Sequence, residues 1–260
     1  MLTKQHYLQF QTFGFVMLQS VFTEYELALI NDEFAEAMDA AYRHEPFDGT
    51  KRHWVPMLGE SAPFFSELLE DSRLCDVAEQ LYGEDAIGML ADANRYVGDT
   101  HWHADTGSFH QYGVKFAFYL EPVGPDSGAL RVIPGSHKQP LHDDLKRTIP
   151  ELDPPIRDIP AHVCTAEPGD VVAFDLRLWH SSHGGSDDRR MCTCVYYNNP
   201  KTEEEKKATL RQASNHRKTI ASFHANGITV FTSHWVSNPK GSPRRQRWIE
   251  RLRELEFIGT

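Results

Sequence analysis

The first part of the chain has the apolar spacing of amphipathic helices. Four apolar residues recur at steps of three and four positions: Leu27, Ile30, Phe34 and Met38. This spacing predicts a helix with one apolar stripe that must pack against a neighbouring element. Thr23 and Glu26 have the spacing of a capping box, so we expect the helix to begin there. Residues 1–85 are predicted to form a helical N-terminal region that frames the rest of the molecule, apart from one short strand at residues 14–18.

Residues 86–200 have a different pattern, in which short apolar runs are separated by glycine, proline, aspartate and serine. The runs are predicted strands and lie at residues 87–90, 96–97, 114–120, 130–133, 171–174 and 191–197. Several short strands at this spacing indicate a β sandwich or barrel such as a jelly roll. We therefore predict a fold that is mainly β with flanking helices.

Two further stretches complete the organisation of the chain. Residues 139–166 are charged and rich in proline with weak periodicity, and we interpret them as an insertion between strands that acts as a lid. Residues 201–260 are predicted to be helical, because a second capping box lies at 202–205 and Ser242-Pro243 opens an arginine-rich helix. No internal repeat or interdomain linker is evident. We expect residues 1–260 to form a single domain.

Composition and charge narrow the function classes. The 27 basic and 37 acidic residues give a net charge of −10, which removes the positive field on which non-specific binding to nucleic acid or an anionic membrane relies. The chain has no apolar run of about 18 residues and no signal-peptide pattern at its start. Its 4 cysteines lack the spacing of a disulfide or zinc framework. We expect a cytoplasmic protein that acts on a small molecule and binds neither nucleic acid nor membrane; a homo-oligomer is compatible with these features.

A cluster of histidines carries the strongest chemical signal. The sequence His-Trp-His-Ala-Asp places His103 and Asp105 two residues apart, so on an extended segment both side chains can reach one point in space. His180, beyond a predicted strand, is the natural third ligand. Two imidazoles and one carboxylate on one face of a metal leave positions open, as in non-haem Fe(II) oxygenases. His101 is the main rival ligand and His183 a weaker one.

An adjacent pair of arginines follows the last of these histidines. Arg189 and Arg190 lead into the predicted strand at 191–197. A guanidinium group can hold the distal carboxylate of a dicarboxylate such as 2-oxoglutarate by two parallel hydrogen bonds, which lysine cannot reproduce. Neighbouring residues of a strand point to opposite faces, so only one of the two can be this anchor. Ser182 offers a hydroxyl group to the same carboxylate.

With these motifs, the chain resembles the phytanoyl-CoA dioxygenase-like Fe(II)/2-oxoglutarate oxygenases. The resemblance runs from residue 12 to about residue 197. Its matching motifs are Trp102-His103-Ala104-Asp105, the segment at 128–137 that ends in Ile133-Pro134-Gly135-Ser136-His137, and Pro168-Gly169-Asp170 through Trp179-His180. It implies a double-stranded β-helix core of the jelly-roll or cupin type. It also implies Fe(II) held by His103, Asp105 and His180, with 2-oxoglutarate and O₂ as cosubstrates and succinate and CO₂ as products.

The resemblance also bears on the anchor and on the reaction. Family members commonly carry the anchoring arginine four residues after a serine. Counted from Ser186, this pattern favours Arg190 as the anchor of 2-oxoglutarate. The loop is one residue shorter than the usual pattern, which leaves Arg189 as the alternative. Related halogenases usually replace the carboxylate ligand by a small residue, so Asp105 favours hydroxylation or a related oxidation. No segment indicates a coenzyme A site.

We therefore predict an Fe(II)- and 2-oxoglutarate-dependent oxygenase that hydroxylates a small polar metabolite, a natural-product intermediate or an organophosphonate. One alternative is a zinc hydrolase of the metallo-β-lactamase type, because His101, His103 and Asp105 match its paired-histidine motif in part. Thr106 occupies the place where those enzymes usually carry another histidine. The other alternative is a non-catalytic β-barrel protein that binds a metal.

Overall fold

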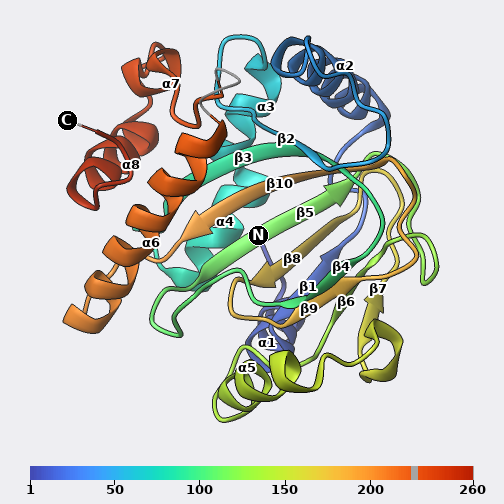
Figure 1. The fold of residues 1–260 in the computed structure, drawn as a ribbon. Helices are drawn as coiled ribbons and strands as arrows, with labels where there is room; N and C mark the ends of the chain where they lie inside the picture. Colours follow the sequence, from blue (N-terminus) through green and yellow to red (C-terminus); the bar gives the residue numbers. More distant parts are fainter. Residues whose placement is uncertain (224–227, 260) are drawn as a thin grey trace.

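Two antiparallel β sheets form the centre of the molecule (Figure 1). The computed structural model describes residues 1–223 and 228–259. The larger sheet has the order β1 (Phe15–Leu18), β8 (Val171–Asp175), β5 (Gly113–Tyr119), β10 (Arg189–Tyr197), β3 (Ile87–Tyr96) and β2 (His53–Pro56). The smaller sheet has the order β4 (Thr100–His103), β9 (His180–Ser182), β6 (Leu130–Val132) and β7 (His162–Cys164). This arrangement confirms the predicted mainly β fold and is that of a double-stranded β-helix.

Helices flank the sheets. They are α1 (Lys4–Phe13), α2 (Glu24–Ala41), α3 (Pro63–Glu67), α4 (Ser72–Tyr82), α5 (Leu141–Leu152), α6 (Glu203–Phe223), α7 (Ser233–Ser237) and α8 (Pro243–Glu254), with short 3₁₀ turns at Leu68–Glu70 and Ile156–Asp158. Figure 1 shows α6, α7 and α8 together on one side of the molecule and α5 at its lower end, near the smaller sheet. Among the described residues, no helix combines the length and hydrophobicity needed to cross a membrane.

The apolar core lies between the larger sheet and its helices. Phe116 and Phe118 of β5 and Cys192 and Cys194 of β10 are completely buried in it. In β3, a side chain at Gly88 would collide with the indole ring of Trp248 from α8, so glycine permits the close approach of helix and strand. The face of the larger sheet that turns toward the helices is therefore a packed apolar surface.

The predicted helix starts are confirmed. At α2, the Glu26 amide donates to the Thr23 hydroxyl (3.3 Å), while the Thr23 amide donates to the Glu26 carboxylate (2.8 Å), which completes the capping box. Ser242 caps α8 as predicted, by accepting from the Arg245 amide. The predicted C-terminal helical region at 201–260 holds α6, α7 and α8, while residues 224–227 and 260 of it lie outside the described residues.

The helical prediction for residues 1–85 is wrong at His53–Pro56, which form the edge strand β2, because pairing with β3 stabilises a segment too short to show its own periodicity. The segment 139–166 contains α5, which packs with Trp102 and Trp179 of the smaller sheet. None of its residues lines the cavity between the sheets, so its action as a lid stays a prediction.

Candidate metal and cosubstrate site

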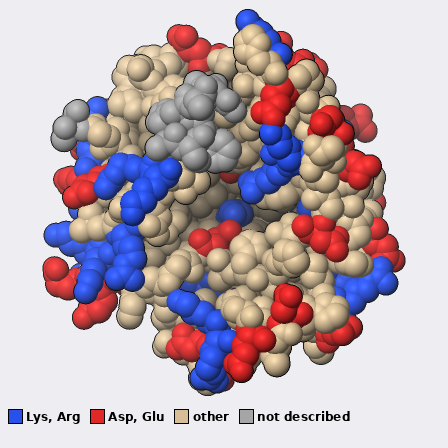
Figure 2. Space-filling model, in the orientation of Figure 1, with Lys and Arg blue, Asp and Glu red and all other residues tan. Residues whose placement is uncertain are grey.

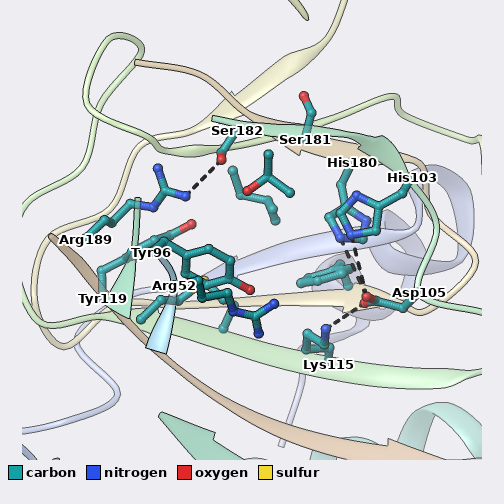
Figure 3. A pocket seen from close by; sticks show the side chains of 15 residues that line it. Arg52, Tyr96, His103, Asp105, Lys115, Tyr119, His180, Ser181, Ser182 and Arg189 are labelled. Atoms are coloured by element: carbon teal, nitrogen blue, oxygen red, sulfur yellow. Dashed lines mark hydrogen bonds and ion pairs between the residues drawn. The ribbon is translucent and has the colours of Figure 1, made fainter. Parts of the chain in front are cut away.

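Two histidines and one aspartate converge where the smaller sheet opens (Figure 3). His103 ends β4 and His180 begins β9, and the pairing of these strands sets the two residues opposite each other. Asp105 follows β4 by two residues. Its Oδ1 atom lies 3.9 Å from the Nε2 atom of each histidine. One donor atom from each of the three residues lies within 4.8 Å of the others, a spacing that can hold a metal ion.

The backbone fixes both imidazole rings in the orientation that a metal requires. Nδ1 of His103 lies 2.8 Å from the His101 carbonyl oxygen, and Nδ1 of His180 lies 2.8 Å from that of Leu178. A carbonyl only accepts, so each Nδ1 carries the proton and each Nε2 lone pair faces the aspartate. Burial and the neighbouring His103 lower the pKa of His180 to about 3, which keeps its ring neutral and able to bind a metal.

A buried lysine orients the carboxylate ligand. The Lys115 ammonium on β5 lies 2.8 Å from Oδ2 of Asp105, while Oδ1 faces the histidines. Burial alone would raise the pKa of Asp105, but Lys115 and the two histidines outweigh it and hold that pKa well below its usual range. The carboxylate therefore stays ionised and presents one oxygen to the position where His103 and His180 could bind the same metal ion.

The rival histidines lie outside this cluster. His101 is exposed and contributes its backbone carbonyl. Nδ1 of His183 lies 2.8 Å from Oδ2 of Asp99, which orients that ring toward the loop instead. Neither ring belongs to the group of donor atoms that could share one ion.

An unpaired arginine lies in the same cavity as the histidines. Nη2 of Arg189 donates to the Ser182 hydroxyl (3.0 Å) and Nη1 donates to the Gly98 carbonyl (3.2 Å). The residue is 3% exposed, and its Nε atom has no hydrogen-bond partner. Within residues 1–223 and 228–259, no carboxylate pairs with it. A buried guanidinium group without a counter-charge is costly, so this position favours a bound anion.

Glycines make room for this guanidinium group. A Cβ atom at Gly128 or at Gly185 would overlap the Arg189 side chain. Gly128 also has a φ of +84°, which other residues rarely adopt. The loop before β6 and the loop before β10 therefore form a cradle that only glycine leaves open.

The structure places Arg190, the anchor that the resemblance favours, away from this cavity. Arg190 lies on the opposite face of the sheet, where its Nε is 3.1 Å from Oε2 of Glu121 and its Nη1 donates to Asn31 of α2 (2.9 Å). In β10, Arg189 and Met191 face the smaller sheet and line the cavity. The alternate residues Arg190, Cys192 and Cys194 therefore face the helices. Because the preceding loop is one residue shorter than usual, the arginine that faces the cavity lies three residues after Ser186 instead of four.

One cavity between the sheets is lined both by His103, Asp105 and His180 and by Arg189. It has a volume of about 150 Å³, and its apolar wall is formed by Ala117, Leu130, Phe174 and Met191. Four polar lining residues had no signal in the sequence: Arg52, Thr100, Tyr119 and Ser181. Figure 2 shows a hollow near the centre of this side of the molecule, with basic and acidic side chains visible inside it. The cavity can therefore hold a small polar ligand between the three candidate metal ligands and Arg189.

Comparison with known proteins identifies a family and relatives. The family described as phytanoyl-CoA dioxygenase (PhyH) matches residues 10–192. Among curated proteins, an ectoine dioxygenase of Sphingopyxis alaskensis is 27% identical over 208 residues, which cover 66% of this chain and 67% of the relative.

Solved structures share the fold. EctD from S. alaskensis in its apoform superimposes with a TM-score of 0.58 at 21% identity, over 76% of this chain and 77% of that chain. HygX from Streptomyces hygroscopicus, solved with nickel and 2-oxoglutarate bound, gives a TM-score of 0.60 at 19% identity, over 76% and 87% of the two chains. At these identities the likeness shows the double-stranded β-helix fold alone.

Proposed function

The chain belongs to the phytanoyl-CoA dioxygenase family, and on that premise we propose that His103, Asp105 and His180 hold Fe(II) while Arg189 and Ser182 hold 2-oxoglutarate. The chain is a 2-oxoglutarate-dependent dioxygenase that uses iron and O₂. Neither the zinc hydrolase nor the non-catalytic alternative is supported by the relatives.

One observation carries the assignment of residues. A single cavity has the His, His, Asp donor set on one wall and a buried, unpaired arginine on another. A dicarboxylate with a 2-oxo group matches both, because one end can chelate the metal and the other can pair with the guanidinium group. Arg190 cannot serve in the same way, since its guanidinium group is paired with Glu121 outside the cavity.

Each side chain has a definite task in the reaction. Bound Fe(II) couples the oxidative decarboxylation of 2-oxoglutarate by O₂ to oxidation of a substrate C–H bond, with succinate and CO₂ as products. Arg189 positions the distal carboxylate, and the Ser182 hydroxyl, which accepts from Arg189, keeps its own proton free to donate. Lys115 holds one oxygen of Asp105 so that the other is directed to the metal. Phe174 and Leu130 exclude water from the part of the cavity that lies between the metal ligands and Arg189.

The substrate proposed is a small polar molecule that becomes hydroxylated. The cavity is small, and polar side chains such as Thr100 and Ser181 line it together with the apolar wall. The relatives that are named for ectoine support a substrate of metabolite size. Asp105 supplies a carboxylate at the position where related halogenases usually have a small residue. This supports hydroxylation over halogenation.

Succinate formation tests this function. Purified protein with Fe(II), 2-oxoglutarate and O₂ should release succinate slowly without a primary substrate, and a panel of small polar metabolites and organophosphonates should identify compounds that accelerate it. Omission of iron or of O₂ should abolish the release. If the protein instead binds zinc tightly, fails to bind 2-oxoglutarate and releases no succinate under any condition, the proposal is wrong.

A further inference from the structure

We infer that Arg52 forms a second anion-binding position in the cavity, and that the primary substrate carries a carboxylate or phosphonate group that binds there. The inference rests on the proposed function, in which Arg189 already holds 2-oxoglutarate. Arg52 precedes β2, is exposed to solvent, and lines the same cavity as His103, Asp105 and His180; Figure 3 shows its guanidinium group beside the Tyr96 ring.

The pairing of arginines distinguishes the cavity from its surroundings. Arg95, Arg177 and Arg190 lie near the cavity but do not line it, and each forms an ion pair with an aspartate or glutamate. Arg52 and Arg189 line it, and among the described residues neither has a carboxylate partner. Two arginines without a carboxylate partner on one cavity provide two places for anionic groups.

A buried hydrogen-bond chain holds Arg52 in place. Its Nε donates to Oδ1 of Asn94 (3.1 Å), and the Asn94 amide donates to Asp92 (2.9 Å). Asp92 also accepts from the Trp54 indole (2.8 Å) and the Thr193 hydroxyl (2.7 Å). Asn94 and Asp92 are 1% and 6% exposed, so this support is a built part of the core. Because the arginine is already ordered, an anion binds without the full entropic cost of fixing a long side chain.

One aromatic ring lies close to both guanidinium groups. The Cζ atom of Arg52 is 4.4 Å from the centroid of the Tyr96 ring, and that of Arg189 is 5.2 Å from it. The ring stabilises both cations. The two anion positions are therefore adjacent but separate, as a cosubstrate and a substrate that meet at one metal require.

Of the three basic side chains that line the cavity, Arg52 is the one without a counter-charge in the loaded enzyme. Lys115 is neutralised by Asp105, and Arg189 is neutralised by the distal carboxylate of 2-oxoglutarate under the proposed function. The remaining 2-oxoglutarate carboxylate and the 2-oxo group would face the metal. Arg52 is then an arginine of the cavity without a counter-charge, held in place at the solvent-accessible side, and a substrate oxyanion can pair with its guanidinium group.

Binding of simple oxyanions to the loaded enzyme tests the inference. The probes are methylphosphonate and acetate, with acetamide as the neutral counterpart of acetate, titrated calorimetrically into the anaerobic Fe(II)·2-oxoglutarate enzyme. Wild-type protein should bind at least one of the oxyanions and not acetamide, and the stronger of the two identifies the group. Arg52→Met should weaken that binding by about 10-fold or more. Arg52→Lys, which keeps the charge but loses the fork, should fall between the two.

The control is Arg247→Met, which removes an exposed arginine of α8 and should bind the probes as wild type does. In all three variants 2-oxoglutarate should bind within about 2-fold of wild type. If 2-oxoglutarate binds normally but the oxyanions fail to bind, or bind Arg52→Met as tightly as wild type, the inference is overturned while the proposed function stands. Failure of wild-type protein to bind 2-oxoglutarate would overturn both.

Discussion

Strand β10 presents two neighbouring arginines to two different environments. Arg190 turns toward the helices, where Glu121 and Asn31 satisfy it within the protein. Arg189 turns into the cavity, where it is buried, cradled by glycines and left without a counter-charge. The residues have the same chemistry, so the difference lies in the partner. A charge that the fold neutralises belongs to the structure, whereas a buried charge that the fold leaves unpaired marks a ligand.

A second cavity supports the same distinction. It has a volume of about 300 Å³ and lies beside α1, where Tyr82, Asp175 and Arg177 meet. Arg177 donates to Asp175 through both Nε (2.9 Å) and Nη2 (2.7 Å), and the Tyr82 hydroxyl donates to the same carboxylate (2.7 Å). These charges satisfy one another. We therefore regard this cluster as structural, in contrast to the cavity that contains Arg189.

Removal of a metal ligand should have the largest effect. His180→Ala deletes one of three donors and should lower Fe(II) affinity by more than about 100-fold and abolish succinate formation. Metal binding by equilibrium dialysis and turnover by succinate release measure both effects. His183→Ala is the matched control, because this histidine pairs with Asp99 outside the cluster. Equal loss in both variants would remove the distinction between the two histidines.

Removal of the lysine behind the carboxylate should have the next largest effect. Lys115→Met leaves Oδ2 of Asp105 without its ion pair, so the orientation of Oδ1 relaxes and Fe(II) affinity should fall about 10-fold to 100-fold. Lys201→Met removes an exposed lysine that pairs with Asp85 and should leave Fe(II) affinity unchanged. Unaltered Fe(II) binding by Lys115→Met in equilibrium dialysis would show that the ion pair does not position the ligand.

A methyl group in the arginine cradle should have a smaller effect. Gly185→Ala places a Cβ atom against both the Gly98 carbonyl oxygen and the Arg189 guanidinium group that it binds, and should raise the KM for 2-oxoglutarate by about 10-fold, because misplacement of a positioning group weakens binding. Gly107→Ala has open space around the added atom and should leave this KM unchanged. Steady-state succinate assays compare the two, and an equal KM in both variants would contradict the cradle.

On the helix side of the sheet, a paired charge should affect stability and not ligand binding. Arg73 and the Thr23 cap hold the pKa of Glu26 at about 2, below its ordinary value of 4.5. The ionised carboxylate therefore stabilises the fold above pH 4.5, and this contribution is lost as the pH falls from 4.5 to about 2. Glu26→Gln should lower the free energy of unfolding by about 1–2 kcal/mol at pH 7 and by less at pH 3.

Urea denaturation at the two pH values measures this difference. Glu24→Gln, in the same first turn of α2 but exposed, is the control and should change stability little at either pH. A destabilisation by Glu26→Gln that is the same at pH 3 and pH 7 would show that the ionised form of the carboxylate is not what stabilises the helix start.

The sequence predicts what depends on local spacing. The interval between His103 and Asp105 places two donors on one side of an extended segment, and the capping boxes at residues 23 and 202 start helices by hydrogen bonds within four residues. His180 was predictable because it directly follows an apolar strand and a turn. These features need no knowledge of distant contacts.

Other features depend on contacts that spacing does not encode. Most of β10 is buried on both faces, so its residues show no alternation of polar and apolar character from which the inward face could be read, and Arg189 and Arg190 could not be distinguished. Arg52 lies in a stretch predicted to be helical, and its position depends on Asn94, 42 residues away. Strands of three or four residues, such as β9, are likewise defined by their partners.

The most direct test compares the two arginines of β10 in one experiment. Fe(II)-loaded wild type, Arg189→Leu and Arg190→Leu are titrated anaerobically with 2-oxoglutarate while the visible charge-transfer band of the iron-bound 2-oxo acid is followed. The account predicts wild-type affinity within about 2-fold for Arg190→Leu and a loss of about 30-fold or more for Arg189→Leu, since a buried charge-assisted pair is removed. Loss of affinity in Arg190→Leu with normal binding by Arg189→Leu would contradict it.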